Sequence, residues 1–235
     1  APIDRTPQIE EVQGNVMLKR PDAKQLRRRL ECLAEENLVS LFGVASVDVF
    51  DSVVAELKEQ IDEEELGEGV EDEGERINGS PLHGPWVSKT TEENVRIMGP
   101  KDYMDKAKSV IVLGMHFQDE LIQNSGLEKT KQIGTYAYHQ YQTCFELRFA
   151  AMELARYLNR LGYKTLVTEN MLGIGSKVDT PRGALPDARC NAIEAVAAGL
   201  GDIGKSGALL TDEHGPHQRQ IVIITDAEIP TDSPY

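Results

Sequence analysis

Two continuous apolar runs constrain the fold of this chain more than any other feature. They are residues 109–117 (SVIVLGMHF) and 218–225 (QRQIVIIT). Both are rich in β-branched residues and largely lack polar/apolar alternation, which is typical of strands that are covered on both faces. We therefore predict two buried central strands in one sheet. Shorter apolar runs at residues 41–49, 164–168 and 208–211 are expected to add further strands.

Helical periodicity predicts the elements that pack on this sheet. The predicted helices cover residues 22–38, 50–65, 138–161 and 187–198. Asp22 is a candidate N-cap, while Gly162 and Gly199 stand where glycine commonly ends a helix. Because strands alternate with helices and a hairpin-like pair ends the chain, we expect an α+β fold with a central mixed sheet flanked by helices.

The acidic charge is concentrated in one segment. The 235 residues contain 25 Lys and Arg against 39 Asp and Glu, a formal net charge of −14, and residues 62–76 (DEEELGEGVEDEGER) carry nine of these acids. So many carboxylates cannot be packed together without counter-charges, so we expect a solvated excursion. The acidity disfavours nucleic acid as a partner, because nucleic-acid interfaces are basic. No apolar run approaches the ~18 residues of a membrane span.

Cysteine usage and the N-terminus bear on the compartment. Cys32, Cys144 and Cys190 are far apart and form no C-x-x-C, so no zinc ribbon and no iron–sulfur run is expected within these residues. Sparse cysteines suit a reducing compartment, and the N-terminus lacks the apolar segment of a signal peptide. We therefore expect a cytoplasmic protein. A first residue other than Met fits either removal of the initiator or trimming of an exported precursor.

The densest local signal is the Gly-rich segment 199–207 (GLGDIGKSG). It matches both G-x-G-x-x-G and G-x-x-x-x-G-K-S, the patterns of dinucleotide- and phosphate-binding loops. Both patterns need a strand before the loop and a helix after it, whereas here a predicted helix precedes and a strand follows, which argues against both. Two interpretations stay open. The glycines shape a helix-to-strand corner, or they let a flat ligand approach the backbone, with Lys205 and Arg219 supplying charge.

Residues 192–226 resemble the cobalamin-dependent reductases, the superfamily of reductive dehalogenases and epoxyqueuosine reductase. The resemblance rests on the run AGLGDIGKSGALLT, on a Gly-Pro turn at 215–216 and on a strand that ends in Thr-Asp at 225–226. A weaker match extends it upstream to roughly residue 100. The resemblance implies a nitroreductase-like α+β domain that binds base-off cobalamin.

The same resemblance implies an organisation and an activity. Residues 100–235 would form the corrinoid-reductase-like domain, and residues 1–99 an N-terminal arm, a helical region and an acidic loop that can pack with it as one unit. Family members continue into a ferredoxin-like segment with two 4Fe–4S clusters, which we expect only if the chain continues beyond Tyr235. The implied activity is reductive cleavage of a small organic substrate, with electrons from such clusters or from an electron donor protein.

The resemblance also implies a set of site residues. Tyr141, near the start of the long helix, and Asp179, in the run Val-Asp-Thr, are candidate proton donors. The candidate cofactor-binding residues are Gly199, Leu200, Gly201, Gly204, Lys205, Ser206, Gly207, Gly215, Pro216 and Arg219. No metal ligand is expected from the protein, because family corrinoids bind without an axial histidine and the His spacings match no metal site. We further expect residues 199–207 and 215–219 to line the largest cleft.

Several alternatives stay open at this point. The turn GPHQRQ is more similar to the dehalogenase branch, whereas Val-Asp-Thr at 178–180 is similar to the tRNA-modifying branch. A flavin-binding nitroreductase-like protein would share the fold, although no R-S-x-R-x-[FY] run is present to bind the flavin phosphate. A non-catalytic corrinoid carrier or maturation protein is the third candidate.

Overall fold

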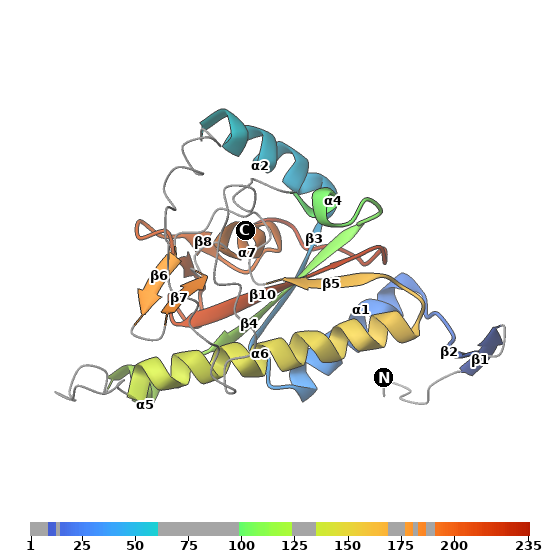
Figure 1. Cartoon of the computed structure of the whole chain (residues 1–235), viewed down its shortest axis with the longest axis horizontal. Helices are drawn as coiled ribbons and strands as arrows, with labels where there is room; N and C mark the ends of the chain where they lie inside the picture. The colour runs from blue at the N-terminus through green and yellow to red at the C-terminus, as the bar shows by residue number, and fades with distance from the viewer. Residues whose placement is uncertain are drawn as a thin grey trace.

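A four-stranded sheet lies at the centre of the molecule (Figure 1). The computed structural model describes residues 9–12, 15–60, 99–123, 135–168, 177–180, 183–186 and 191–235. The strands follow the order β3 (Leu41–Ser46), β4 (Ser109–His116), β10 (Gln218–Thr225) and β5 (Thr165–Thr168). The two strongest apolar runs thus form the two central strands, which confirms that prediction. The acidic segment 62–76 lies outside the described residues.

Every neighbouring pair in this sheet is antiparallel, so the expectation of a mixed sheet is wrong for the described strands. The last strand, β10, lies between β4 and β5 and runs opposite to both. β4 and β5 are therefore parallel to each other without being neighbours, which is a split β-α-β arrangement. The alternation of strands and helices predicted only an α+β fold, and the expected hairpin-like pair at the end of the chain is wrong, because β9 pairs with β8 while β10 pairs with β4 and β5. The alternation could not indicate that the C-terminal strand would insert between β4 and β5.

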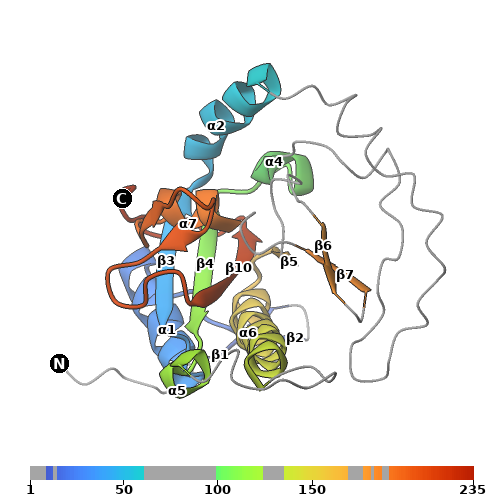
Figure 2. The ribbon, with the colours of Figure 1, turned by 90° about the vertical axis from the view of Figure 1, so that its left-hand side faces the viewer.

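Helices cover both faces of the sheet (Figure 2). On one face, α1 (Ala23–Glu36) and α6 (Thr135–Arg160) pack against Ile111 and Ile223. On the other face, α7 (Ala192–Ala197) and the first turn of α2 (Val47–Gln60) pack against Val110 and Val222. Because successive side chains of a strand point to opposite faces, this double cover explains why β4 and β10 are apolar without alternation.

The helix ends bear out the local signals. The Asp22 carboxylate accepts a hydrogen bond from the Gln25 backbone N–H at 2.9 Å, as an N-cap does. Gly162, after α6, and Gly199, after α7, both have positive φ, 79° and 72°. Arg20 also covers the end of α6, because its guanidinium donates to the carbonyl oxygens of Leu161 and Gly162 at 2.8 Å.

Other boundaries differ from the expectation. The apolar run 41–49 is split, since β3 ends at Ser46 and α2 begins at Val47. An apolar run alone cannot show where a strand turns into a helix. Here α2 begins directly after β3, and its first N–H, that of Val47, bonds to the Lys108 carbonyl at 3.2 Å. The described part of the N-terminal arm forms a hairpin of β1 (Ile9–Val12) and β2 (Asn15–Leu18).

Six short elements complete the described chain. They are α4 (Pro100–Tyr103), α5 (Asp119–Gln123), the hairpin of β6 (Lys177–Thr180) with β7 (Gly183–Pro186), and the hairpin of β8 (Asp202–Ile203) with β9 (Leu209–Leu210). Helix α1 and strand β3 belong to residues 1–99 yet share the core and the sheet with later residues. Among the described helices, none is long and apolar enough to cross a membrane.

Candidate functional site

One end of the sheet gathers the elements that carry the predicted site residues. Figure 1 shows α5, the beginning of α6 and the hairpins β6–β7 and β8–β9 toward the same end. At this end β4 finishes at His116, which is paired with Gln218 at the start of β10. Tyr141 is on the N-terminal half of α6 and Asp179 is on β6, opposite Ala184. The side chains of Tyr141 and Asp179 are outside the described residues.

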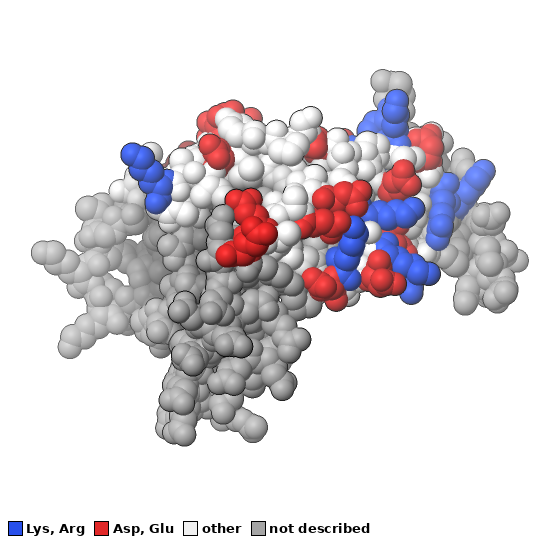
Figure 3. Space-filling model, turned by 90° about the horizontal axis from the view of Figure 1, so that it is seen from above, with Lys and Arg blue, Asp and Glu red and all other residues white. Residues whose placement is uncertain are grey.

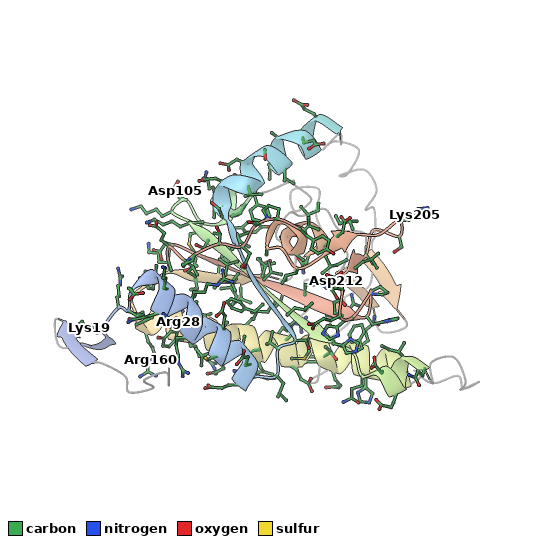
Figure 4. The ribbon with its side chains drawn as sticks, turned by 180° about the vertical axis from the view of Figure 1, so that it is seen from behind. Lys19, Arg28, Asp105, Arg160, Lys205 and Asp212 are labelled. Carbon is green, nitrogen blue, oxygen red and sulfur yellow. The ribbon has the colours of Figure 1, made fainter. Side chains whose placement is uncertain are left out.

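The Gly-rich segment folds as a tight hairpin. The Gly204 N–H donates to the Ala208 carbonyl, and the Gly207 N–H donates to the Gly204 carbonyl, both at 2.9 Å. Lys205 and Ser206 are therefore at the tip of the β8–β9 hairpin, and Figure 4 shows Lys205 projecting from it. A helix C-terminus precedes the hairpin, so the phosphate-loop patterns fail here for the reason expected, which is the wrong order of helix and strand.

Three of the glycines make close approaches within this chain. A Cβ on Gly199 would lie 2.5 Å from the Ser233 carbonyl oxygen, and one on Gly201 would overlap the Leu210 carbonyl oxygen. A Cβ on Gly204 would lie 2.8 Å from a terminal carbon of Leu210. Gly215 differs, because its φ of 54° requires glycine while nothing lies within 4 Å of its Cβ position. Intramolecular packing thus explains the glycines of the hairpin, and Gly215 is the one with open space.

Two polar side chains at the start of β10 have buried atoms without partners among the described residues. They are Arg219, at its Nε, and Gln218, at its Oε1. Gln218 uses its amide nitrogen to donate to the Leu209 carbonyl at 3.1 Å. Because neighbouring residues of a strand face opposite ways, the two orphan atoms lie on opposite faces of the sheet. A buried polar atom without a partner is costly, so each is a position where a ligand or water would be stabilised.

A histidine pair also lies at this end of the sheet. His116, the last residue of β4, stacks on His214, with ring centroids 4.2 Å apart and an interplanar angle of 14°. The Nδ1 of His116 is 2.9 Å from the His217 carbonyl oxygen, and its Nε2 is 2.9 Å from an Asp119 carboxylate oxygen. Sequence reasoning tested the histidines only for the spacing of metal ligands, and no spacing relates residues that meet through tertiary structure. The H-G-P-H run beside a strand ending in His was the available signal.

The surroundings of His214 disfavour its charged form. Burial is the largest cause that lowers the pKa of His214 below its ordinary value, and the neighbouring His116 lowers it further. Glu213 and Asp119 act in the opposite direction. Within the part of the chain that the structure describes, no group of three or more His, Cys, Asp or Glu could hold a metal ion. The histidine pair is therefore a hydrogen-bonded and stacked unit, with no metal site built around it.

Comparison with known proteins gives a sequence relative. No protein-family model matches the chain. Over 130 residues the chain is 30% identical to the tetrachloroethene reductive dehalogenase of Desulfitobacterium hafniense. The matched residues make up 55% of this chain and 19% of that protein. The resemblance to the cobalamin-dependent reductases is confirmed. The chain spans only about a fifth of the length of this curated relative.

Solved structures of cobalamin-dependent reductases share the fold. An epoxyqueuosine reductase from Bacillus subtilis, with its catalytic Asp loop swung out of the active site, matches 90% of this chain with a TM-score of 0.56 and 20% identity. A catabolic reductive dehalogenase in complex with 3-bromo-4-hydroxybenzoic acid matches 97% with a TM-score of 0.55 and 14% identity. The chain covers 48% and 24% of those two proteins. At such identities the match shows the fold alone.

Proposed function

We propose that this chain is the corrinoid-binding part of a reductase of the dehalogenase type, which reductively cleaves a small organic substrate. The observation that carries the proposal is the 30% identity over 130 residues to a tetrachloroethene reductive dehalogenase. The fold shared with two kinds of cobalamin-dependent reductase supports it. The dehalogenase is favoured over the tRNA-modifying branch because the sequence relative is a dehalogenase.

The residues at the sheet end fit a corrinoid in their chemistry. A corrinoid carries many amide groups around its ring, which need hydrogen-bond donors and acceptors. The acceptor Oε1 of Gln218 lies on the opposite face of the sheet from Arg219 and is left out of the proposed site. The buried Nε of Arg219 offers a donor, and Gly215 leaves open space beside its backbone. We propose that five residues hold the corrinoid periphery: Lys205, Ser206, Gly215, Pro216 and Arg219. The other candidates shape the hairpin that carries Lys205 and Ser206 at its tip. They are Gly199, Leu200, Gly201, Gly204 and Gly207.

The proposed reaction is balanced by one proton and two electrons. A carbon–halogen bond breaks and a carbon–hydrogen bond forms, R–X + 2 e⁻ + H⁺ → R–H + X⁻. A bound corrinoid would supply the redox chemistry of its cobalt. The electrons come from iron–sulfur clusters or from an electron donor protein. Tyr141 or Asp179 donates the proton at its hydroxyl or carboxyl oxygen, and the apolar sheet behind excludes water from the site.

A small molecule is the favoured substrate class. The chain carries a net charge of −14, and Figure 3 shows Lys and Arg interspersed with Asp and Glu on the face seen from above. A nucleic-acid interface is instead expected to be a continuous basic surface. One solved neighbour is an epoxyqueuosine reductase with a bound tRNA stem loop.

Titration of the purified protein with hydroxocobalamin tests the proposal. We expect saturable binding with a change in the visible spectrum, and no binding of flavin mononucleotide in a matched titration. The loaded protein, supplied with a low-potential chemical reductant and a small organohalide, should release halide. Binding without halide release would favour the non-catalytic carrier. Flavin binding in place of cobalamin would contradict the proposal and favour the nitroreductase-like alternative.

A further inference from the structure

Histidine side chains contribute to holding the turn from Thr211 to His217 against the sheet. Within the turn, the Thr211 and Gly215 backbones bond to each other at 2.9 and 3.1 Å. Toward the sheet, the His217 carbonyl accepts from the Phe117 backbone N–H at 2.9 Å and faces Nδ1 of His116. The ring of His214 covers the ring of His116. This turn contains Gly215, which has open space beside it.

The ring of His116 faces an acceptor at each of its two nitrogens. A carbonyl oxygen and a carboxylate oxygen are both acceptors, so only a ring that is protonated at both nitrogens can donate to both. A neutral ring stacked on that cation is attracted to it, because the ring face carries partial negative charge. A second cation at 4.2 Å would instead be repelled. The stack is therefore most stable with one charged and one neutral imidazole.

We propose that the stacked His116–His214 pair positions the turn 211–217 for the ligand of the site and releases it on acidification. The part of this inference that concerns the ligand rests on the proposed function, while the coupling of the two rings does not. The charged groups that act on His214 are His116 from β4, Asp119 from α5 and Glu213 from the turn itself. His116 and His214 are positioning residues in this account.

The direction of the pH effect follows from the charge states. The folded protein disfavours a proton on His214, whose pKa is lowered from 6.5, mainly by burial and then by His116. Between pH 6.5 and that lower value the unfolded chain binds more protons than the folded chain, so stability falls as the pH falls. The turn, which carries the second charge, is the part expected to loosen first.

Histidine ring signals in an NMR pH titration test the coupling without any cofactor. We expect the His214 midpoint in the wild type to lie below 6.5. His116→Gln removes the neighbouring cation and should move the midpoint up, while Asp119→Asn removes a neighbouring anion and should move it down. If the two substitutions only loosened the turn, the His214 midpoint would move toward 6.5 in both variants. Shifts in opposite directions in His116→Gln and Asp119→Asn therefore separate coupling from misfolding. The matched control is His217→Gln, which keeps the backbone carbonyl that faces His116.

Hydroxocobalamin titration at about pH 8 and about pH 5, the range in which histidine changes charge, tests the effect on the ligand. Binding by the wild type and by His217→Gln should weaken at the acid end, and His214→Gln should lose that dependence. Identical His214 midpoints in wild type and His116→Gln would overturn the coupling. Absence of cobalamin binding at both pH values would overturn the proposed function and the ligand part of this inference, while the NMR midpoints would still decide the coupling.

Discussion

Arg27 and Asp232, which are 205 residues apart in the sequence, join helix α1 to the C-terminal segment. The Nη2 of Arg27 lies 2.8 and 2.9 Å from the two carboxylate oxygens of Asp232. The same carboxylate accepts the Val44 N–H at 2.9 Å, and the Asp232 N–H donates to the Val44 carbonyl at 2.8 Å. Asp232 thus satisfies the free edge of β3, which would otherwise expose backbone groups able to pair with another chain.

Replacing Asp232 by Ala should destabilise the fold. The pair is only partly exposed, 18% for Arg27 and 32% for Asp232. Its loss leaves Nη2 of Arg27 and the Val44 N–H without an acceptor, while Nε and Nη1 of Arg27 keep Glu31 and the Pro230 carbonyl. We expect a loss of about 2 kcal/mol in the free energy of unfolding, measured by urea denaturation. The control is Glu228→Ala in the same segment, whose pair with Lys108 is exposed and should contribute less than about 0.5 kcal/mol. Equal losses in the two variants would contradict this role.

Gly201 and Gly204 should respond differently to the same substitution. A Cβ on Gly201 would overlap the Leu210 backbone carbonyl, whereas a Cβ on Gly204 would meet the Leu210 side chain, which is 42% exposed and can turn away. We expect Gly201→Ala to lower the free energy of unfolding by about 2 kcal/mol, and Gly204→Ala by about 0.5 kcal/mol or less. A loss of stability in Gly204→Ala that is larger than the loss in Gly201→Ala would contradict this difference.

Arg219→Gln should weaken cobalamin binding without unfolding the protein. The buried Nε has no partner among the described residues, so the free protein loses no described hydrogen bond when it is removed. If that nitrogen donates to the ligand, affinity should fall about tenfold, the size of one charged hydrogen bond. Arg156→Gln, on the exposed side of α6, is the matched control and should bind as the wild type does. Unchanged affinity in Arg219→Gln would remove this residue from the site.

Tyr141→Phe and Asp179→Asn separate binding from proton donation. A side chain that only donates the proton should leave cobalamin affinity unchanged, while halide release falls about a hundredfold or more. Tyr163→Phe is the control. Tyr163 follows the C-terminal end of α6, and its ring centroid lies 4.4 Å from the guanidinium carbon of Arg20. The measurement is halide released per loaded protein. Full activity in both variants would assign the proton to another group.

Two half-buried tyrosines predict a loss of stability at alkaline pH. Burial is the largest cause that raises the pKa of Tyr103 and of Tyr157 above 10, with Glu194 and Asp102 adding to it for Tyr103. Above pH 10 the unfolded chain has lost these protons while the folded chain retains them, so stability falls as the pH rises. Urea unfolding across this range should show the decline. The double variant Tyr103→Phe, Tyr157→Phe should flatten it, whereas an unchanged slope would assign the decline to other groups.

The elements that sequence reasoning predicted well are those that depend on near neighbours. The cap at Asp22 needs only a carboxylate three residues before an N–H, and the glycines after α6 and α7 need only a positive φ. The strands β4 and β10 are recognisable because double cover removes alternation. The resemblance to the cobalamin-dependent reductases added the candidate proton donors and the turn at 215–216, whose roles stay predictions.

The features that sequence reasoning missed join residues far apart in the chain. His116 meets the turn before β10 across 101 residues, and nothing in the spacing of the histidines indicated a stack. The hairpin glycines were interpreted in part as an approach for a ligand, but Gly199 and Gly201 face carbonyl oxygens of Ser233 and Leu210. A glycine in the sequence indicates that space is needed beside the backbone, but the sequence does not identify the neighbour that occupies this space.

Local chemistry alone was sufficient to identify the N-cap at Asp22, the glycines that end α6 and α7, the two strands that are covered on both faces, and the reason why the Gly-rich segment is no phosphate loop. Tertiary structure alone decided that β10 inserts between β4 and β5, that Asp232 closes the edge of β3, and that His116 stacks on His214. The physical reason is range. Capping and periodicity act over a few residues, whereas strand order and burial depend on the free energy of the whole packed core, to which every distant segment contributes.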